Sequence, residues 1–323
     1  MTLVTVDDIR AAAERIRGVA RGTPVLDLSD LAGRSLVIKC EHHQPGGAFK
    51  IRGALNMVAT LAPDALRRGV ITYSSGNHGQ AVALAASRLH APAVVVMPTT
   101  APAVKVRGVR RWGAEVILEG TTSLDRKRRA EAEAAARGLT MVPPFDHALV
   151  IAGQGTCGLE LLEQVPDLGT VVIPVGGGGL ISGIAAAIRR LRPSVRIIGV
   201  EPAGAAKMSA SLKAGAPVSL ESTASIADGL MPVRPGDLTF AHVREFVDDV
   251  VTVTDAEIAR ATLWLYFEAK QVVEPSGAAT TAAILWPARG GPLVNPPGPV
   301  VAIVSGGNVA PETLAALEAS QPS

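Results

Sequence analysis

The lysine at position 50 occupies a position where an amine can do covalent chemistry. It ends the glycine-rich segment QPGGAFK at residues 44–50 and precedes an apolar stretch typical of a helix. An amine held in this way can form a Schiff base with an aldehyde. Three other segments could contribute the remaining groups of such a site: SSGNHG at 74–79, GGGG at 176–179 and SGGN at 305–308. These segments outweigh the simpler interpretation of Lys50 as an ordinary exposed lysine.

The elements that would position these segments alternate between short β-branched runs and alanine-rich stretches. Strands are predicted at residues 36–39, 69–73, 93–97, 115–118, 170–175, 196–200 and 299–304, and helices at 51–61, 80–89, 105–112, 124–137 and 180–191. Near-continuous Val/Ile runs separated by helices are typical of parallel strands buried on both faces. The pattern predicts an α/β fold with open, mostly parallel sheets flanked by helices. Ligands bind beyond the carboxyl ends of such strands, where the segments beginning at Ser74, Gly176 and Ser305 lie.

The composition favours an enzyme-sized globular chain. Its 323 residues are 48% hydrophobic and 19% charged, which is ample for a buried core and suggests two domains. The formal net charge of +2 gives no indication of nucleic acid or an anionic membrane as partner. The basic run at 126–129 is followed by Glu131 and Glu133, a mixture typical of a solvated helix face. The two cysteines, Cys40 and Cys157, show no metal spacing and no disulfide framework, which favours an intracellular protein.

The sequence predicts neither a signal peptide nor a membrane span. The uncharged stretch at 168–188 is long enough to cross a bilayer, but Pro174 and four glycines interrupt it. A strand, a loop and a helix in succession are therefore predicted for this stretch instead of one membrane-spanning helix. The first 17 residues lack an apolar segment and predict a helix capped by Thr5, with Asp8 three residues later. We expect a cytoplasmic protein.

The glycine run at 176–179 predicts an anion site. Backbone N–H groups at a helix N-terminus bind anions, and missing side chains let a phosphate approach closely. A flexible, closely packed turn is the alternative. Glu201, beyond the next strand, also suggests a dinucleotide-binding unit. However, the strict GxGxxG spacing is absent, because Gly177 and Gly179 would require glycine where Ser182 stands.

Seven segments in one order resemble a known family over nearly the whole chain: residues 41–56, 74–81, 151–156, 176–179, 227–229, 274–275 and 305–309. The family is that of the fold-type II pyridoxal phosphate enzymes, specifically the serine/threonine dehydratase (ammonia-lyase) and serine racemase branch. The resemblance implies pyridoxal 5′-phosphate as cofactor, a tryptophan synthase β-like fold and a homodimer or larger assembly. It also implies a small domain at 69–144, inserted in a large cofactor-binding domain made of 1–68 and 145–323.

The resemblance assigns cofactor contacts. Lys50 would hold the cofactor through an imine, and Phe49 would lie beside the pyridine ring. Asn77 would hydrogen-bond the ring hydroxyl, and Ser305 the ring nitrogen. Two further residues belong to segments expected at the cofactor, Gly229 and Glu274, although Glu274 could instead be a strand-end or helix-cap acid. Backbone N–H groups would bind the phosphate at five positions, Gly176, Gly177, Gly178, Gly179 and Leu180.

The resemblance also implies substrate contacts and a reaction. Ser74, Asn77 and His78 belong to the turn expected to hold the substrate carboxylate, although a lone histidine beside a glycine turn is often structural. Pyridoxal phosphate stabilises a carbanion at the α-carbon, and the released Lys50 amine could take the α-proton. We expect water elimination from a β-hydroxy amino acid, which converts L-threonine to 2-oxobutyrate or L-serine to pyruvate with release of ammonia.

Two other functions stay open. Racemisation needs a second acid or base on the face opposite Lys50, and Ser75 stands at the matching position, although it could be merely a small turn residue. A serine or related amino-acid racemase with side elimination is therefore one alternative. A non-catalytic protein that binds the cofactor or an amino acid is the other, and intact Lys50, Asn77 and Ser305 argue against it. Because the chain ends soon after residue 309, we expect no regulatory domain of the kind found in biosynthetic threonine dehydratases.

Two departures from the family pattern affect these expectations. A Thr-Gly-Ser often found before Phe-Lys is replaced by residues 46–48, Gly-Gly-Ala, so a hydroxyl near Lys50 is missing. Racemase-like members also bind a divalent cation through a motif that Glu201 and Ala205 match, but Lys207 replaces its final acid. A divalent cation prefers oxygen ligands, and an ammonium opposes it. We predict no metal there and hypothesise that Lys207 replaces the cation and pairs with Glu201; a solvent-facing Lys207 is the alternative.

Overall fold

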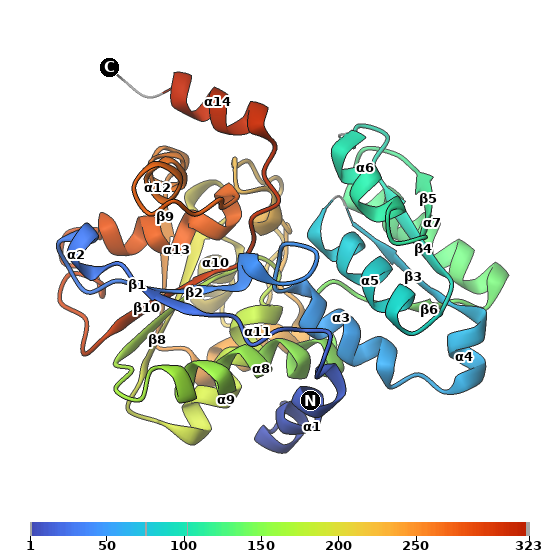
Figure 1. Cartoon of the computed structure of the whole chain (residues 1–323), viewed down its shortest axis with the longest axis horizontal. Helices are drawn as coiled ribbons and strands as arrows, with labels where there is room; N and C mark the ends of the chain where they lie inside the picture. The colour runs from blue at the N-terminus through green and yellow to red at the C-terminus, as the bar shows by residue number, and fades with distance from the viewer. Residues whose placement is uncertain (1, 75, 102, 321–323) are drawn as a thin grey trace.

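Two sheets with helices on both sides organise the chain (Figure 1). The computed structural model describes residues 2–74, 76–101 and 103–320. The larger sheet has the strand order β1 (Val25–Asp27), β2 (Val37–Cys40), β10 (Val300–Val304), β7 (Thr170–Pro174), β8 (Arg196–Pro202) and β9 (Asp249–Val253). The smaller sheet has the order β5 (Glu115–Leu118), β4 (Ala93–Met97), β3 (Val70–Tyr73) and β6 (Thr140–Met141). Every pairing is parallel except that of β1 with β2, which confirms the predicted α/β class.

Helices cover both faces of each sheet. Their bounds are α1 Val6–Ile16, α2 Ser29–Ala32, α3 Lys50–Ala59, α4 Pro63–Arg68, α5 Asn77–Arg88, α6 Ala103–Arg110, α7 Ser123–Arg137, α8 Ala148–Gln164, α9 Gly179–Leu191, α10 Lys207–Ala214, α11 Asp237–Phe246, α12 Asp255–Phe267, α13 Pro275–Leu285 and α14 Pro311–Ala319. The described residues also form short 3-10 helices at η1 Glu41–His43, η2 Ala203–Ala205 and η3 Asp228–Leu230. Helix α3 packs against both α8 and α5, so it lies between the layers of the two sheets (Figure 1).

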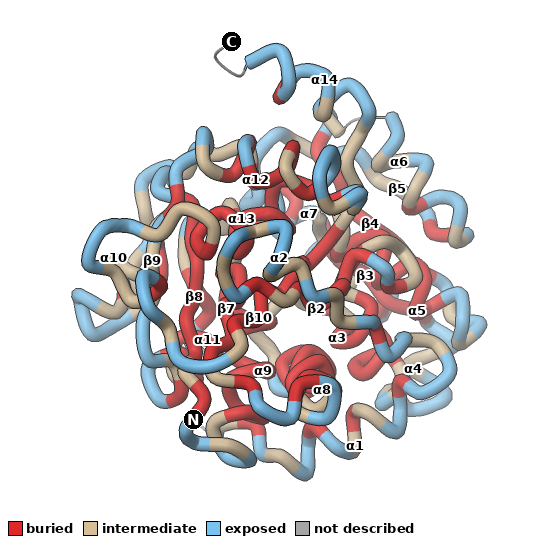
Figure 2. Tube along the Cα trace, turned by 60° about the vertical axis from the view of Figure 1, so that its left-hand side comes forward, coloured by how far each residue is buried: buried red, intermediate tan, exposed pale blue. Residues whose placement is uncertain are grey.

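The apolar strands of the larger sheet are buried on both faces (Figure 2). Val301 and Ile303 of β10 point into the core cluster that contains α8 and α9 residues. Ala302 and Val304 point into the opposite cluster, under α12 and α13. Because successive strand residues face opposite sides, a strand covered on both sides needs a continuous apolar run. The central strands can therefore be predicted from the sequence.

The chain path agrees with an inserted small domain. The smaller sheet draws its strands from one stretch, β3 to β6, whereas the larger sheet takes β1 and β2 from before that stretch and its other strands from after it. The bounds 69–144 stay a prediction.

Several helix bounds differ from the predicted ones. The capping box of Thr5 and Asp8 is present at the start of α1, as predicted. Helix α5 begins at Asn77 rather than residue 80, and α3 ends at Ala59 rather than residue 61. Helix α8 was not predicted, because it contains glycines that weaken an isolated helix. Gly153 has no room for a side chain, since a Cβ there would overlap the backbone of Arg52 in α3.

The uncharged stretch at 168–188 divides into β7, the glycine loop and α9. Within the described parts of the chain, no helix has both the length and the apolarity needed to cross a bilayer.

Candidate functional site

Lys50 lies at the first position of α3, beside the turn that contains Ser305. The Phe49 backbone N–H donates to the Ser305 carbonyl oxygen at 3.1 Å, and Ala48 forms a β-bridge with Gly306. The Lys50 Nζ donates to the Pro144 carbonyl oxygen at 2.7 Å and lies 5.1 Å from the centre of the Phe49 ring. Burial lowers the pKa of the Lys50 amine to about 8. About a tenth of this amine is therefore unprotonated and nucleophilic at pH 7, far more than for an ordinary lysine.

Asn77 connects the two sheets through its side chain. Its Nδ2 donates to Glu274 Oε1 at 2.6 Å, and its Oδ1 accepts from Asn308 Nδ2 at 2.9 Å. Asn308 Nδ2 also donates to the Gly46 carbonyl oxygen at 2.8 Å, just before Lys50. These bonds bring the segments at 44–50, 74–79, 274–275 and 305–308 into one place. The segments at 74–79 and 305–308 were predicted to meet because each follows a strand.

The glycine run forms the N-terminus of α9, as its spacing predicted. Gly178 is the N-cap residue in the left-handed conformation, with φ of 98°, and no described side chain caps the helix. The first-turn N–H groups are thus free of a protein cap, which suits an anionic phosphate. The glycines are also required by packing: a Cβ on Gly177 would overlap the Phe145 ring, and one on Gly178 would lie 2.8 Å from Thr239. The closely packed turn and the anion site are therefore compatible interpretations.

The η3 turn is in contact with the glycine loop. A Cβ on Gly176 would lie 2.9 Å from the Gly229 carbonyl oxygen, so the two segments are in contact. The Gly229 N–H in turn donates to Ser276 Oγ at 2.8 Å, in the first turn of α13. Gly229 therefore lies where its segment was expected, although it contributes backbone rather than a side chain.

Glu274 faces this site rather than its own helix. It is the N-cap residue of α13, yet its side chain caps no backbone N–H. The carboxyl instead reaches Asn77 and leaves no room for a side chain at Gly306. Burial, together with the nearby Asp228 carboxylate, raises the pKa of Glu274 to about 7. The side chain is therefore not a helix cap, and its contact with the cofactor stays a prediction.

His78 is neutral and buried in the first turn of α5. Burial, with a smaller effect of the Lys50 amine, lowers the pKa of His78 to about 3. Its Nε2 donates to the Val142 carbonyl oxygen at 3.0 Å, which is a structural role. Its Nδ1 has no hydrogen-bond partner among the described residues. Ser74 Oγ accepts from the Gly76 N–H at 3.1 Å, whereas Ser75 lies outside the described residues.

One ion pair at the site was not predicted. Lys105 of α6 pairs with Asp228 of η3, which joins the layer of the smaller sheet to that of the larger. Its Nζ lies 3.7 Å from the position that a Cβ on Gly76 would take, next to the Ser74 turn. Asp228 belongs to a family-like segment, but no local signal in the sequence marks Lys105.

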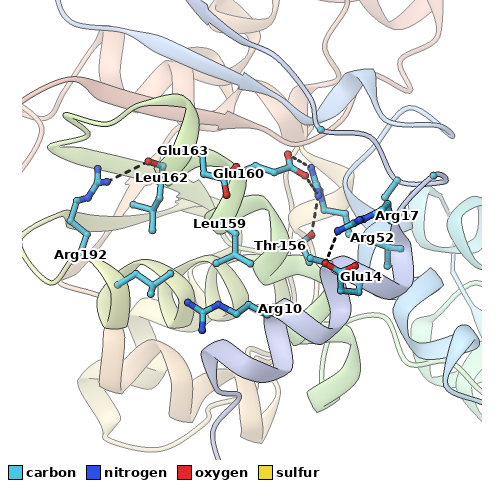
Figure 3. Close-up of a pocket in the computed structure, with 16 residues that line it drawn as sticks. Arg10, Glu14, Arg17, Arg52, Thr156, Leu159, Glu160, Leu162, Glu163 and Arg192 are labelled. Carbon is cyan, nitrogen blue, oxygen red and sulfur yellow. Dashed lines mark hydrogen bonds and ion pairs between the residues drawn. The ribbon is translucent and has the colours of Figure 1, made fainter.

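A buried charge network supports the start of α3, and Figure 3 shows the part of it between Arg52 and Glu160. The Arg52 guanidinium donates to both Glu41 oxygens at 2.7 and 2.8 Å and to Glu160 at 2.6 and 2.8 Å. Arg52 and Glu41 are fully buried, and Lys39 also pairs with Glu160. The network joins α3, two residues after Lys50, to η1 and α8. A cavity of about 740 Å³ adjoins it between α1, α8 and α9, and Lys50, Asn77 and Ser305 are not among its lining residues.

Lys207 is fully buried with oxygens on several sides. Its Nζ donates to the carbonyl oxygens of Val175 at 2.8 Å, Leu230 at 2.9 Å and Ala205 at 3.0 Å, and it lies 3.1 Å from Glu201 Oε1. The side chain therefore does not point to solvent. Burial lowers the pKa of Lys207, and the Glu201 carboxylate opposes this shift.

Glu201 also binds the start of α10. Its carboxylate accepts hydrogen bonds from the N–H groups of Met208 and Ser209. Val175 directly precedes the glycine loop and Leu230 ends η3, so the Lys207 ammonium holds together the two segments that enclose the predicted phosphate site.

Known proteins resemble this chain over nearly its full length. The sequence matches the family described as "Pyridoxal-phosphate dependent enzyme" over residues 16–306. It is 42% identical to an L-threonine ammonia-lyase of Thermotoga maritima, over 95% of this chain and 76% of that protein. It is 43% identical to a serine racemase of Arabidopsis thaliana, over 93% and 92%. The solved structure of maize serine racemase superposes with a TM-score of 0.93 at 40% identity, covering 98% of each chain.

The site fits the cofactor that this family uses. The Lys50 amine bonds to Pro144, whose neighbour Phe145 contacts the glycine loop of α9, and hydrogen bonds hold Asn77 and the Ser305 segment in the same region. These groups fit the requirements of an attachment point, a phosphate site and partners for a heteroaromatic ring. The chain therefore belongs to the pyridoxal-phosphate dependent enzymes and has the fold-type II architecture of that family's dehydratases and racemases.

Proposed function

We propose that the protein is an ammonia-lyase that removes water from a β-hydroxy amino acid. L-Threonine would yield 2-oxobutyrate and L-serine would yield pyruvate, each with ammonia. The observation that carries the proposal is the desolvated Lys50 amine, with its pKa lowered to about 8, beside the Ser305 turn. The names of the threonine ammonia-lyase relatives support the same reaction class.

Each part of the cofactor would have a partner in this chain. Lys50 would carry it, Phe49 would lie beside the ring, Asn77 would bind the ring hydroxyl and Ser305 the ring nitrogen. The N–H groups of residues 176–180 would hold the phosphate at the start of α9. When bound, pyridoxal phosphate supplies an electron sink for negative charge at the substrate α-carbon.

Lys50 would act as the base that removes the α-proton. A pKa of about 8 lies close to the operating pH, where a general base is most effective. A substrate carboxylate bound at the start of α5, by Ser74, Asn77 and His78, would meet the positive end of a 12-residue helix. This contact would place the α-carbon on the Lys50 side. The neutral His78 suits a hydrogen-bonding role rather than a charged one.

Racemisation is the second candidate, because close relatives carry the name serine racemase. It would need an acid or base opposite Lys50, and Ser75 is the residue we assign to that role from the sequence. The two reactions share the first proton transfer and differ in the second step. Elimination releases the β-hydroxyl as water, whereas racemisation returns a proton to the other face.

The test measures both products from one incubation. Purified holoenzyme is supplied with L-threonine or L-serine, and 2-oxo acid, ammonia and D-amino acid are quantified. We expect stoichiometric 2-oxo acid and ammonia, which a Lys50→Ala variant fails to produce. D-Serine formed by wild type and lost in Ser75→Ala, with elimination retained, would establish the racemase activity. The absence of 2-oxo acid from every β-hydroxy amino acid tested would overturn the ammonia-lyase proposal.

Lys207 would serve as a built-in cation in this enzyme. Its ammonium has three carbonyl oxygens and a carboxylate oxygen within 3.1 Å, a set of ligands that a divalent ion would also accept. With the positive charge already covalently supplied, activity should not depend on a divalent metal at Glu201 and Ala205. Assembly into a homodimer or larger oligomer is a further expectation from the family.

A further inference from the structure

A cluster of metal-ligating side chains lies at the carboxyl end of β2, outside the proposed catalytic machinery. Cys40 ends the strand, and His42 and His43 lie in η1 directly after it. The Cys40 sulfur and one ring nitrogen of each histidine all lie within 4.8 Å of one another. Ligands of one tetrahedral zinc ion lie about 3.5 Å apart, given metal–ligand bonds of about 2.0–2.3 Å. Side-chain rotations that move the ligand atoms by about 1 Å would therefore bring all three within bonding distance of one ion.

The contact of His42 with Gln271 is compatible with the tautomer that a metal ligand requires. Gln271 Nε2 donates to the Ala269 carbonyl oxygen at 3.3 Å, which orients Gln271 Oε1 toward His42 Nε2 at 3.0 Å. In this orientation of the amide the Gln271 oxygen accepts, which assigns the proton to His42 Nε2 and the lone pair to Nδ1. Metal-binding histidines typically donate their second ring N–H to an oxygen in this way.

His42 lies near the Val304 backbone, but its Nδ1 forms no hydrogen bond of normal geometry in the described part of the chain. His42 is only 8% exposed, and its Nδ1 is buried without a hydrogen bond. A buried polar atom without a partner costs free energy, and such atoms are rare in folded proteins. A bound ion would satisfy this nitrogen.

The other two side chains complete a site of recognisable chemistry. Cys40 is fully buried, whereas His43 is exposed, so an ion could enter from solvent and keep a water molecule as its fourth ligand. One sulfur and two imidazole nitrogens favour zinc and its chemical relatives over magnesium or calcium, which prefer oxygen. The spacing of the cysteines alone gave no sign of this site, because histidines supply two of its three ligands.

We propose that Cys40 Sγ, His42 Nδ1 and a ring nitrogen of His43 bind one zinc-class divalent ion. The ion–sulfur bond forms as the Cys40 thiol releases its proton to water. The site is separate from catalysis but adjoins it. A Cβ on Gly307 would lie 3.3 Å from His42 Cβ, and the Gly307 N–H donates to the Gly47 carbonyl oxygen at 2.9 Å. A bound ion would therefore stiffen both segments that lead to Lys50 and Ser305, without being required for the reaction.

The test uses chelator-treated holoenzyme and measures metal binding directly. Zinc binding is measured by equilibrium dialysis, and Co²⁺ is added separately as a spectroscopic probe. We expect one ion per chain and the intense visible d–d bands of four-coordinate Co²⁺. The His43→Ala variant, in which only an exposed side chain changes, should bind zinc at least about tenfold more weakly. His90→Asn changes another exposed histidine and serves as the matched control, with unchanged binding.

Cys40→Ser gives a second, independent readout. It should abolish the intense Co²⁺ bands, while the cofactor absorbance shows that the variant is folded and loaded. Equal zinc binding by wild type and His43→Ala would overturn the proposal. So would a weak, six-coordinate Co²⁺ spectrum in wild type, or no zinc retained on dialysis. None of these results bears on 2-oxo acid release, so failure here is distinguishable from failure of the ammonia-lyase proposal.

Discussion

The amide of Asn77 donates a 2.6 Å hydrogen bond to the carboxyl of Glu274, a residue 197 positions away. The bond joins the first turn of α5, beside the smaller sheet, to the start of α13, which covers the larger sheet. Asn308 Nδ2 donates to both Asn77 Oδ1 and the Gly46 carbonyl oxygen, which extends the network to the segment before Lys50. The proposed catalytic site is thus assembled from four distant segments by side-chain hydrogen bonds, and Glu274 is its buried acid.

Glu274 should make stability fall as the pH rises. In protein stripped of its cofactor, the folded-state pKa of about 7 exceeds the ordinary value of 4.5. Between these values the folded state binds more protons than the unfolded state, so the free energy of unfolding decreases with increasing pH. The loss should approach about 3 kcal/mol between pH 4.5 and 7. Glu274→Gln keeps an oxygen for Asn77 and should abolish this component.

Urea unfolding at several pH values between 4.5 and 7.5 measures the effect. Glu268→Gln, which changes an exposed glutamate near the end of α12, is the control and should follow wild type. A Glu274→Gln protein with the same pH dependence as wild type would show that folding leaves the pKa of this carboxyl unchanged.

Lys207 should make the enzyme independent of divalent metal. Strong chelator should leave 2-oxo acid release unchanged, because the ammonium already occupies the centre of the oxygen cluster. Lys207→Met removes the donor shared by Val175 and Leu230, so cofactor affinity should fall by about tenfold or more. Lys213→Met, at an exposed lysine of the same helix, should bind the cofactor normally. Activity lost in chelator and restored by magnesium would refute the role assigned to Lys207.

Gly177 should be intolerant of even one added methyl group. Alanine there would overlap the Phe145 ring and displace the N–H groups at the start of α9. We expect the cofactor dissociation constant to rise by about tenfold or more, the equivalent of at least one lost hydrogen bond to a charged group. Gly22→Ala is the matched control, since nothing lies within 4 Å of the added carbon. Equal affinities of the two variants, measured by fluorescence titration, would argue against a phosphate at this loop.

The ion pairs of Arg52 at the start of α3 should contribute strongly to the free energy of unfolding. Arg52→Met leaves the fully buried Glu41 carboxylate without its guanidinium, which should cost about 3–5 kcal/mol in urea unfolding. Adding Glu41→Gln should recover part of this loss, because the stranded charge is then removed. Arg10→Met, at an exposed arginine lining the adjacent cavity, should change stability by no more than about 0.5 kcal/mol. A similar small effect of Arg52→Met would mean that water reaches Glu41.

Local patterns explain which parts of this site are predictable. The end of β7, the glycine loop and the start of α9 follow from Pro174 and four glycines between two apolar runs. The sequence predicts the start of α5 at residue 80, three residues after its actual start at Asn77. Gly76, Asn77 and Gly79 are weak helix formers, and tertiary packing outweighs their low helix propensity. The Lys105–Asp228 pair joins residues 123 positions apart, and no periodicity reports such a contact.

Like contacts between distant residues, the burial of individual polar side chains could not be predicted from the sequence. Lys207 could have pointed to solvent, and only its position among three carbonyl oxygens excludes that. The raised pKa of Glu274 likewise depends on groups that fold around it.

The attachment point of the cofactor is the central claim, and one experiment tests it most directly. Borohydride reduction of the holoenzyme fixes pyridoxal phosphate to the amine that holds it, and peptide mass spectrometry then locates the modified residue. We predict a single phosphopyridoxyl group on the peptide that contains Lys50, and no such group in Lys50→Ala. A group found on Lys39, Lys105 or Lys207 instead, or one that persists in Lys50→Ala, would contradict the account.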